Sequence, residues 1–435
     1  MKKTRKTTKK GSRRSTPGLI PSMISGLTKV KDRLTRMPEI DWPLFGLCLL
    51  ASLIGIVAIF SAGMTGSTTF GVPRDAFKQG IWLVAGIIAF IFTAGCRADG
   101  IQKWTRGLLM GAAVLVLLTF VPGLGKTENS QTLWLDLKVV SLQPAELLKY
   151  AALMGVALSF SKMTERPIWR GMDSYPSFPH MLEKYILPLI KHNSPVILGF
   201  TCAGLVLAQQ DMATASVILV ATLGMMVASG VPNIQVVKLV GVLAALSLVF
   251  ALTAGYRMSR IQNWVNRYDP AIINHGGFQQ TRSELALAKG GWTGRGLAQG
   301  TIKKSLPTPT SDFVMATVGE ETGVLGVWAI IGIMAAICLR MLHLAERASG
   351  MGRMVCAGAG VWIAAQTAIN VAMVNAWIPA VGLPMPFITY GGSSLIVLWI
   401  LVGAVSALSV RVKEEESVAS DSDGWGHGRT RFSRT

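Results

Sequence analysis

Charged residues are scarce in this sequence. Asp, Glu, Lys and Arg make up 15% of its 435 residues, whereas a soluble domain carries about a quarter. Hydrophobic residues reach 51% and the mean hydropathy is +0.46. Apolar runs of roughly 20 residues recur, which is the length that crosses a hydrocarbon core of about 30 Å. The composition therefore argues against a string of soluble domains and predicts an integral membrane protein.

Paired cysteines and cofactor motifs are also missing. The five cysteines stand alone in or beside apolar runs, without the Cys-x-x-Cys or Cys/His spacing of a zinc site. The sequence contains no Walker loop, no GxSxG, no HExxH and no dinucleotide fingerprint. We therefore expect no nucleotide cofactor and find no metal-ligand motif.

Ten membrane spans are predicted, which makes the fold class all-α and polytopic. Lys and Arg gather in the connections that lie on the same side as the amino terminus, so both termini are predicted to be cytoplasmic. The predicted spans are 42–62, 79–96, 104–122, 139–160, 194–209, 212–230, 236–255, 314–339, 355–377 and 390–410.

Both ends of the chain are polar. Residues 1–40 form a dense basic tail, in which 21–36 have the pattern of a helix lying on a membrane surface. A basic tail can bind nucleic acid, but beside a first span it fits cytoplasmic retention and anionic lipid better, so no nucleic-acid partner is expected. The membrane domain is predicted to span 41–411, and 412–435 to be a disordered cytoplasmic tail.

One long polar connection, 257–312, lies between the seventh and eighth spans and on the outer side in this topology. It is rich in Gly and carries eight Lys and Arg residues, among them Arg260, Arg282 and Arg295. Long loops obey the positive-inside rule weakly. An anionic ligand outside the bilayer is the simplest explanation for so much positive charge.

Asp312, where this loop re-enters the membrane, is the first candidate for chemistry. A carboxylate at a helix start is commonly structural, because the helix dipole favours it. However, Glu320 and Glu321 follow inside the apolar run, and ionisable groups in a span are costly. Such a cluster could bind a divalent cation such as Mg²⁺ or take a proton from a hydroxyl.

Other polar groups stand at predicted span ends. Glu146 and Lys149, near Trp134 and Gln143, are three residues apart on one helical face and could simply pair. Asp211, in a tight turn between two spans, is predicted to be a helix cap. Gln366 and Asn370 project together from the ninth span. The Gly-Gly and Ser-Ser pairs at 391–394 open the last span and could offer backbone N–H groups to a phosphate.

Four segments in this order resemble the signatures of the SEDS family, the FtsW/RodA/SpoVE group of bacterial shape, division and sporulation proteins. They are SLQPAELLK, AQQDMATA, SDFVMATVGEETGVLG and NVAMVNAWIPAVGLPMPFITYGGSS. By this resemblance Asp312 matches an essential loop aspartate and the catalytic base. The residues that match substrate-binding positions, together with the loop arginines, are Trp134, Glu146, Lys149, Arg260, Gln279, Arg282, Ser283, Arg295, Tyr390, Ser393 and Ser394.

The sequence departs from the family pattern at a few positions. The His that precedes the loop aspartate in the family is lost, Gln210 replaces Pro in the second segment, and Arg282 stands where the family has Gln. None of these changes removes the acid. Arg282 would change contacts with substrate or partner.

The resemblance implies a ten-span glycosyltransferase of the bacterial inner membrane. Such an enzyme polymerises lipid II into peptidoglycan strands, with a polyprenyl-diphosphate-linked glycan as donor. The implied partners are a class B penicillin-binding protein and other membrane proteins of the division or elongation machinery. A lipid II flippase and a non-catalytic scaffold for the transpeptidase are the alternatives. The long basic tail leans slightly toward the division type.

Overall fold

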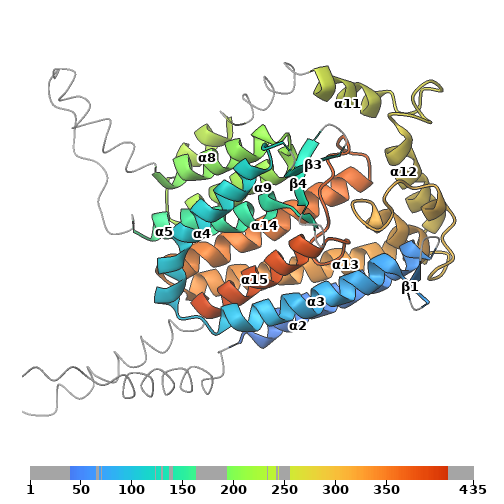
Figure 1. Ribbon diagram of the computed structural model, residues 1–435. Coiled ribbons are helices and arrows are strands. Elements are labelled where there is room, and N and C mark those ends of the chain that lie inside the picture. Colours follow the sequence, from blue (N-terminus) through green and yellow to red (C-terminus); the bar gives the residue numbers. More distant parts are fainter. Residues whose placement is uncertain are drawn as a thin grey trace, which may run out of the picture. The chain divides into compact units, whose positions relative to one another are not determined.

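The computed structural model describes residues 40–64, 68–69, 71–122, 124–128, 131–136, 141–162, 194–232, 234–241, 243 and 255–409. The predicted surface helix at 21–36, residues 163–193 and nearly all of the two polar tails lie outside the described residues. Figure 1 shows a bundle of long helices with shorter helices and loops gathered at one end.

The first three helices of the described residues are long. They are α2 (Trp42–Gly63), α3 (Arg74–Ala94) and α4 (Ala98–Leu118). The start of α2 follows from its sequence, because the Asp41 side chain accepts the Leu44 amide at 2.9 Å and a proline lies in the first turn. All three helices are long and apolar enough to cross a membrane.

In the middle of the chain the described residues include α5 (Pro144–Ser161), α8 (Ser194–Ala208) and α9 (Met212–Ala228). The predicted span at 139–160 began too early, because Ser141–Leu142 is a strand (β5) and the helix starts at Pro144. Residues 234–241 of the predicted seventh span are helical, and 244–254 lie outside the described residues.

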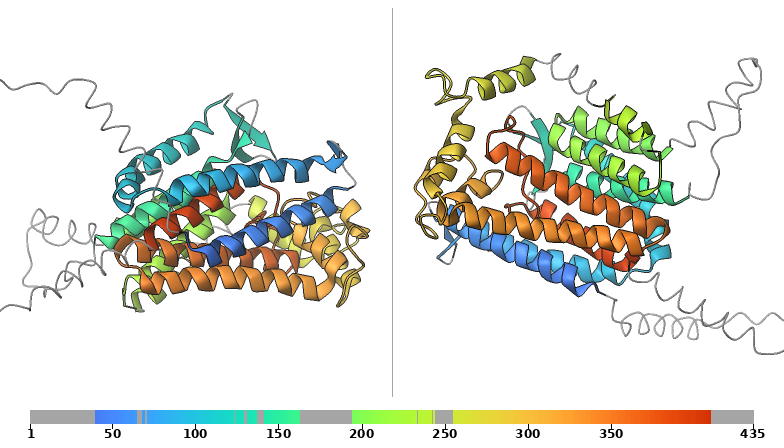
Figure 2. Two further views of the ribbon diagram at one scale, coloured as in Figure 1. Left: turned by 90° about the horizontal axis from the view of Figure 1, so that it is seen from below. Right: turned by 180° about the vertical axis from the view of Figure 1, so that it is seen from behind.

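The last long helices are α13 (Val314–Arg347), α14 (Gly350–Val374) and α15 (Gly392–Ser409), and each is long and apolar enough to span. Helix α14 packs against α13, α9, α5 and α15, so it lies at the centre of the bundle. Figure 2 shows α13 and α14 side by side from behind. Trp362 on α14 and Trp399 on α15 are fully buried.

Two small antiparallel sheets, which the sequence analysis did not predict, lie between helices. One pairs β1 (Thr68–Thr69) with β2 (Val72–Pro73). The other has the order β3 (Gly125–Glu128), β4 (Gln131–Asp136) and β5. The second sheet leads directly into the first turn of α5, so it fixes where that helix begins.

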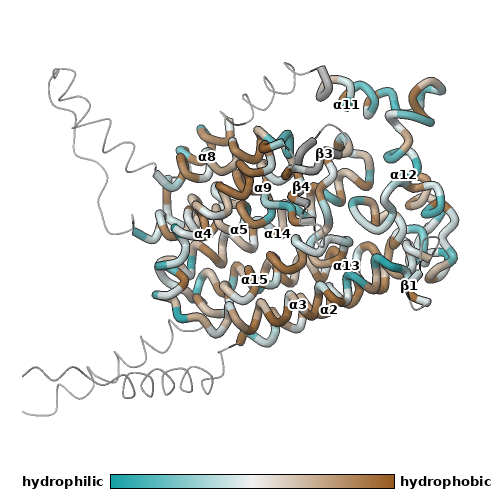
Figure 3. Tube along the Cα trace, viewed as in Figure 1, coloured by the Kyte–Doolittle hydropathy of each residue, from teal (hydrophilic) through white to brown (hydrophobic). Residues whose placement is uncertain are grey.

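The polar loop is folded rather than extended. It contains α11 (Gly255–Val265), α12 (Phe278–Gly290) and a short 3-10 turn, η2 (Ile302–Lys304). Figure 3 shows hydrophilic residues along α11 and around α12, whereas the long helices are mostly hydrophobic. Helix α12 packs on α13, so the loop rests on the bundle at the end where Asp312 lies. We call this end the site end.

Candidate active site

Asp312 lies in the turn immediately before α13, one residue ahead of the helix N-cap Phe313. Its side chain is partly exposed. Burial, and to a smaller extent the negative charge of Asp211, raise the pKa of this carboxyl from 3.8 to about 6. No hydrogen bond or ion pair to another described residue engages the carboxylate. At neutral pH it is therefore mostly ionised and available to accept a proton.

Asn370 fixes the backbone at this position. Its side-chain Nδ2 donates to the carbonyl oxygen of Asp312 at 3.1 Å and to that of Leu383 at 2.7 Å. Asn370 is completely buried on α14. One side chain of the central helix therefore holds together the two segments, 311–313 and 382–384, that border the acid.

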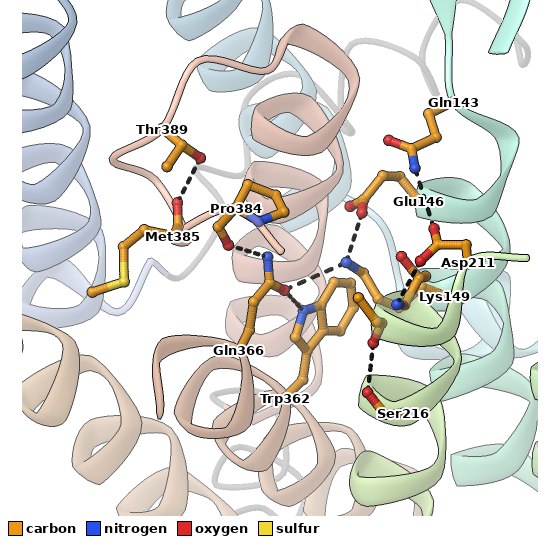
Figure 4. Close-up of polar contacts among 12 residues, drawn as sticks. Gln143, Glu146, Lys149, Asp211, Ser216, Trp362, Gln366, Pro384, Met385 and Thr389 are labelled. Carbon is orange, nitrogen blue, oxygen red and sulfur yellow. Dashed lines mark hydrogen bonds and ion pairs between the residues drawn. The ribbon is translucent and has the colours of Figure 1, made fainter. Parts of the chain in front are cut away.

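Glu146 and Lys149 form a second, buried group on α5. Lys149 Nζ lies 2.8 Å from Glu146 Oε1 and 4.6 Å above the centre of the Trp362 ring. It also donates to Gln366 Oε1 at 3.4 Å. Gln366 in turn donates to the carbonyl of Pro384 at 2.8 Å. Figure 4 shows these contacts joining α5, α14 and the segment before α15 that contains Pro384.

Asp211 is the helix cap that the sequence predicted, since its Oδ1 accepts the Thr214 amide at 2.9 Å. It is more than a cap. Its other oxygen accepts from Gln143 Nε2 at 3.4 Å, and its negative charge raises the pKa of Asp312. Burial raises the pKa of Asp211 as well. Sequence reasoning treated Asp211 as structural alone, and only its polarity in a turn between two apolar helices could have indicated more.

The polar groups thus form one connected strip across the site end. It runs from Asp312 through Asn370 to the 383–384 backbone, then through Gln366 to Lys149 and Glu146. Among the described residues, Glu146 Oε2 and Asn370 Oδ1 are buried without a hydrogen-bond partner. Unpaired buried oxygens are costly, so these two atoms are points of unsatisfied polarity in the strip.

The loop residues predicted to bind substrate differ from one another in burial and in hydrogen bonding. Ser283 is fully buried on α12 and donates to the Val374 carbonyl at 2.7 Å, so its hydroxyl is occupied within the protein. Arg260 donates to the Ala380 carbonyl at 3.1 Å. Arg282 lies over the Phe278 ring, and Arg295 is exposed. Gln279 is half-buried, whereas its neighbour Gln280 holds the Ile378 carbonyl at 2.7 Å.

The remaining predicted residues lie on two other segments. Tyr390 is half-buried, and its amide donates to the Thr310 carbonyl at 2.9 Å, which ties the last turn before α15 to the segment carrying Asp312. Ser393 and Ser394 are half-buried at the start of α15. Trp134 is half-buried on β4, where it pairs with Lys126 of β3. Their roles toward a substrate stay predictions.

Glu320 and Glu321 are not free acids. Glu320 accepts hydrogen bonds from Thr301 and Ile302, and Glu321 forms an ion pair with Lys303 at 2.7 Å. The described residues contain no group of three or more His, Cys, Asp or Glu side chains that could hold a metal ion. The donor set of the described residues therefore does not fit a protein cage for the expected divalent cation.

Comparison with known proteins identifies the family of this chain. The model of the cell cycle protein family that groups FtsW, RodA and SpoVE matches residues 41–414. A probable peptidoglycan glycosyltransferase FtsW from Geobacter sp. (strain M18) is 30% identical over 390 residues, which cover 87% of this chain and 99% of the relative. The chain belongs to the FtsW/RodA/SpoVE family.

Other members agree with this assignment. A probable peptidoglycan glycosyltransferase FtsW from Allochromatium vinosum is 27% identical, with 89% of this chain and 94% of the relative covered. Among solved structures, a chain of a peptidoglycan synthase complex superposes with a TM-score of 0.67 at 21% identity, covering 85% of this chain and 97% of that one. Thermus thermophilus RodA superposes with a TM-score of 0.59 at 24% identity, covering 86% and 97%. The fold is that of this family.

Proposed function

We propose that this FtsW/RodA/SpoVE protein is a peptidoglycan glycosyltransferase that polymerises lipid II. The observation that carries the proposal is the free, partly exposed carboxylate of Asp312, whose pKa is raised to about 6 beside a buried polar strip. A base whose pKa lies near the working pH combines ionisation with proton affinity. Family membership, with relatives named as probable peptidoglycan glycosyltransferases, supplies the reaction class.

The proposed reaction is a displacement at an anomeric carbon. Asp312 takes the proton of the GlcNAc 4-hydroxyl of lipid II, and that oxygen forms a bond to the anomeric carbon of the donor strand's MurNAc. The bond between this carbon and the diphosphate oxygen breaks, and its electron pair leaves with the polyprenyl diphosphate. The proton on Asp312 then passes to water. The donor is already activated, so no sugar nucleotide is consumed.

Positive charge is needed where the diphosphate leaves. Two loop cations are occupied, because Arg267 pairs with Glu284 at 3.0 Å and Lys303 pairs with Glu321. Arg295 and Lys304 are exposed on the loop, and Arg282 is half-buried there. These three are the described loop cations that we assign to the diphosphate.

We further infer a place in the bacterial inner membrane with both termini in the cytoplasm, and a class B penicillin-binding protein as partner. The distribution of Lys and Arg supports this orientation. The structural neighbour from a peptidoglycan synthase complex, in which polymerization and crosslinking are coordinated, supports the partner. Other division or elongation proteins would assemble around this pair.

The decisive experiment is strand synthesis by the protein co-purified with its class B penicillin-binding protein and supplied with lipid II. We expect glycan strands from wild type and none from Asp312→Ala. Asp269→Ala is the matched control, because Asp269 is an exposed carboxylate of the same loop whose side chain accepts the Ala271 amide. Strands from Asp312→Ala would remove the assigned base. No strands from a folded wild-type complex would favour a flippase or a scaffold.

A further inference from the structure

The segment that carries Asp312 is fastened to the first turns of α13 by two adjacent glutamates. Glu320 is completely buried, and its Oε1 accepts the Thr301 amide at 2.8 Å and the Ile302 amide at 3.1 Å. Its Oε2 lies 3.0 Å from the same Ile302 amide. The carboxylate thus satisfies the free amides that begin η2, and it fixes the point from which the chain runs toward Asp312.

Glu321 makes the second attachment, through an ion pair that reaches a third segment. Lys303 Nζ lies 2.7 Å from Glu321 Oε1. It also donates to the Ser61 carbonyl at 2.9 Å and to the Ser61 hydroxyl at 3.2 Å. The Ser61 hydroxyl donates to Glu321 Oε2. Lys303, Glu321 and Ser61 are each about 2–3% exposed. We call these three residues the clasp.

The clasp is a closed set of interactions. All three ammonium donors of Lys303 have acceptors, and both oxygens of Glu321 have donors. Nothing in it is left for a substrate. An internal ion pair of this kind is seldom a net gain in stability, because desolvating two charges offsets their attraction. Its presence therefore calls for a reason other than stability.

The other end of the same segment is fixed at the acid. The Thr310 hydroxyl donates to Asp75 Oδ2 at 3.0 Å, and Asn370 holds the Asp312 carbonyl. Between these two sets of contacts, residues 304–309 have only local backbone and side-chain hydrogen bonds among the described residues. The position of Asp312 therefore depends on anchors at both ends, and the clasp is the anchor that includes α2.

We propose that Lys303, Glu321 and Ser61 are positioning residues for Asp312, which hold the 301–312 segment against α2 and α13 so that the acid faces the reacting hydroxyl. The inference rests on the proposed function for its catalytic readout. It concerns geometry alone, because none of the three touches the reacting atoms. A misplacement of about 1 Å by a distant change can cost about 100-fold in rate.

The test is a double variant, Lys303→Met with Glu321→Met, in the full chain co-purified with its class B penicillin-binding protein. Replacing both charges by apolar groups of similar volume is often tolerated, whereas removing one leaves a buried unpaired charge. We expect the double variant to fold, to keep its KM for lipid II, and to lose turnover by about 100-fold. Wild-type turnover in this variant would overturn the proposal.

The matched control is an ion pair that joins the same two helices at their other end. Arg340 on α13 holds Asp41, the cap of α2, at 2.6 and 3.0 Å. We expect Asp41→Asn with Arg340→Gln to keep wild-type turnover. An equal loss in both double variants would mean that the attachment of α2 to α13 matters in general, and the specific role of the clasp would be wrong.

Hydrogen exchange of residues 304–311 separates this proposal from the proposed function. We expect faster exchange there in the clasp variant and no change in the control. If wild type makes no strands, the proposed function fails, and exchange alone decides whether the clasp holds the segment. Unchanged exchange would overturn the positioning role. If the double variant does not fold, Ser61→Ala, which removes one hydroxyl of the clasp, is tested instead. It should lower turnover and speed hydrogen exchange of residues 304–311 by smaller amounts. The absence of both effects would overturn the proposal.

Discussion

The side chain of Asn370 donates to the backbone carbonyl of Asp312, so the central helix of the bundle holds the acid by its main chain and leaves the carboxylate free. The distance is 3.1 Å, and the same amide reaches the Leu383 carbonyl at 2.7 Å. A base that must collect a proton needs a fixed backbone and an unengaged side chain. This arrangement supplies both.

Replacing Asn370 by Leu should therefore lower turnover. The change removes both donors and leaves two carbonyls without that partner, at a cost of about 1–3 kcal/mol for each group that stays unsatisfied and dry. We expect a loss of about ten-fold or more in strand synthesis. Asn375→Leu is the control, since the side chain of Asn375, the C-cap of the same helix, donates to the Val371 carbonyl of that helix. Equal activity of the two variants would contradict the role of Asn370.

The rate of strand synthesis should fall as the pH drops through about 6, because the base must be ionised and its pKa is raised to about 6. Asp211→Asn removes a negative charge that raises this pKa, so the acidic limb of the pH–rate profile, where the rate falls, should move to lower pH. The measurement is turnover against pH at saturating lipid II. A limb that stays in place in Asp211→Asn would show that the two carboxylates do not interact.

Asp312 should also make the protein less stable at neutral pH. Its folded pKa lies above the ordinary 3.8, so its contribution to stability is present below about 3.8 and is lost as the pH rises through about 6. Asp312→Asn should increase the free energy of unfolding at pH 7.5 by on the order of 1–3 kcal/mol. The melting temperature should rise accordingly. The gain should shrink toward pH 4. A variant less stable than wild type at pH 7.5 would contradict this.

The buried ion pair on α5 should respond differently to single and double changes. Lys149→Met leaves the Glu146 carboxylate buried without its cation, which typically costs about 3–5 kcal/mol. Lys149→Met with Glu146→Leu removes both charges and should recover most of the yield of folded protein. The measurement is the monodisperse fraction after purification. Equal yields for the single and double variants would mean that the two charges are not coupled.

Gly323 should not tolerate a side chain. Helix α13 breaks there, with φ of 68°, and a Cβ would lie 2.4 Å from the Trp292 carbonyl oxygen. Gly323→Ala should therefore detach the loop from α13 and reduce both stability and activity. Gly332→Ala is the matched control on the same helix, because a Cβ there has open space. It should be neutral or slightly stabilising, and melting temperatures compare the two.

Long apolar periodicity explains why most of the bundle could be predicted from the sequence. Nine of the ten predicted spans coincide with helices in the described residues, and Asp211 is the cap that its turn position indicated. The start of α5 was missed because a short strand pair, which carries almost no sequence signal, precedes it. The loop helices α11 and α12 were missed because their sequences are polar and lack the long apolar runs of the spans. Helix α12 gains its stability by packing on α13.

The site was predictable in its residues but not in its connections. Asp312, Glu146 and Lys149 could be named from charge in an apolar setting. The structural roles of Glu320 and Glu321 could not be predicted. Glu320 is bonded by the Thr301 amide, 19 residues away, and Glu321 by Lys303 and Ser61, 18 and 260 residues away. Pairings over such separations depend on how helices are placed, which no local pattern records. Charge alone therefore overstated the number of free acids.

The break in α13 at Gly323 has a consequence for how this loop can change. Residues 291–296 meet the broken helix through main-chain bonds, among them Val324 to the Gly291 carbonyl, Leu325 to that of Trp292, and Arg295 and Gly296 to those of Glu320 and Glu321. Apart from the glycines, these bonds do not depend on side-chain identity. Trp292 and Thr293, both exposed, are thus open to substitution, by divergence or by a spectroscopic label, while the main-chain bonds beneath them stay formed.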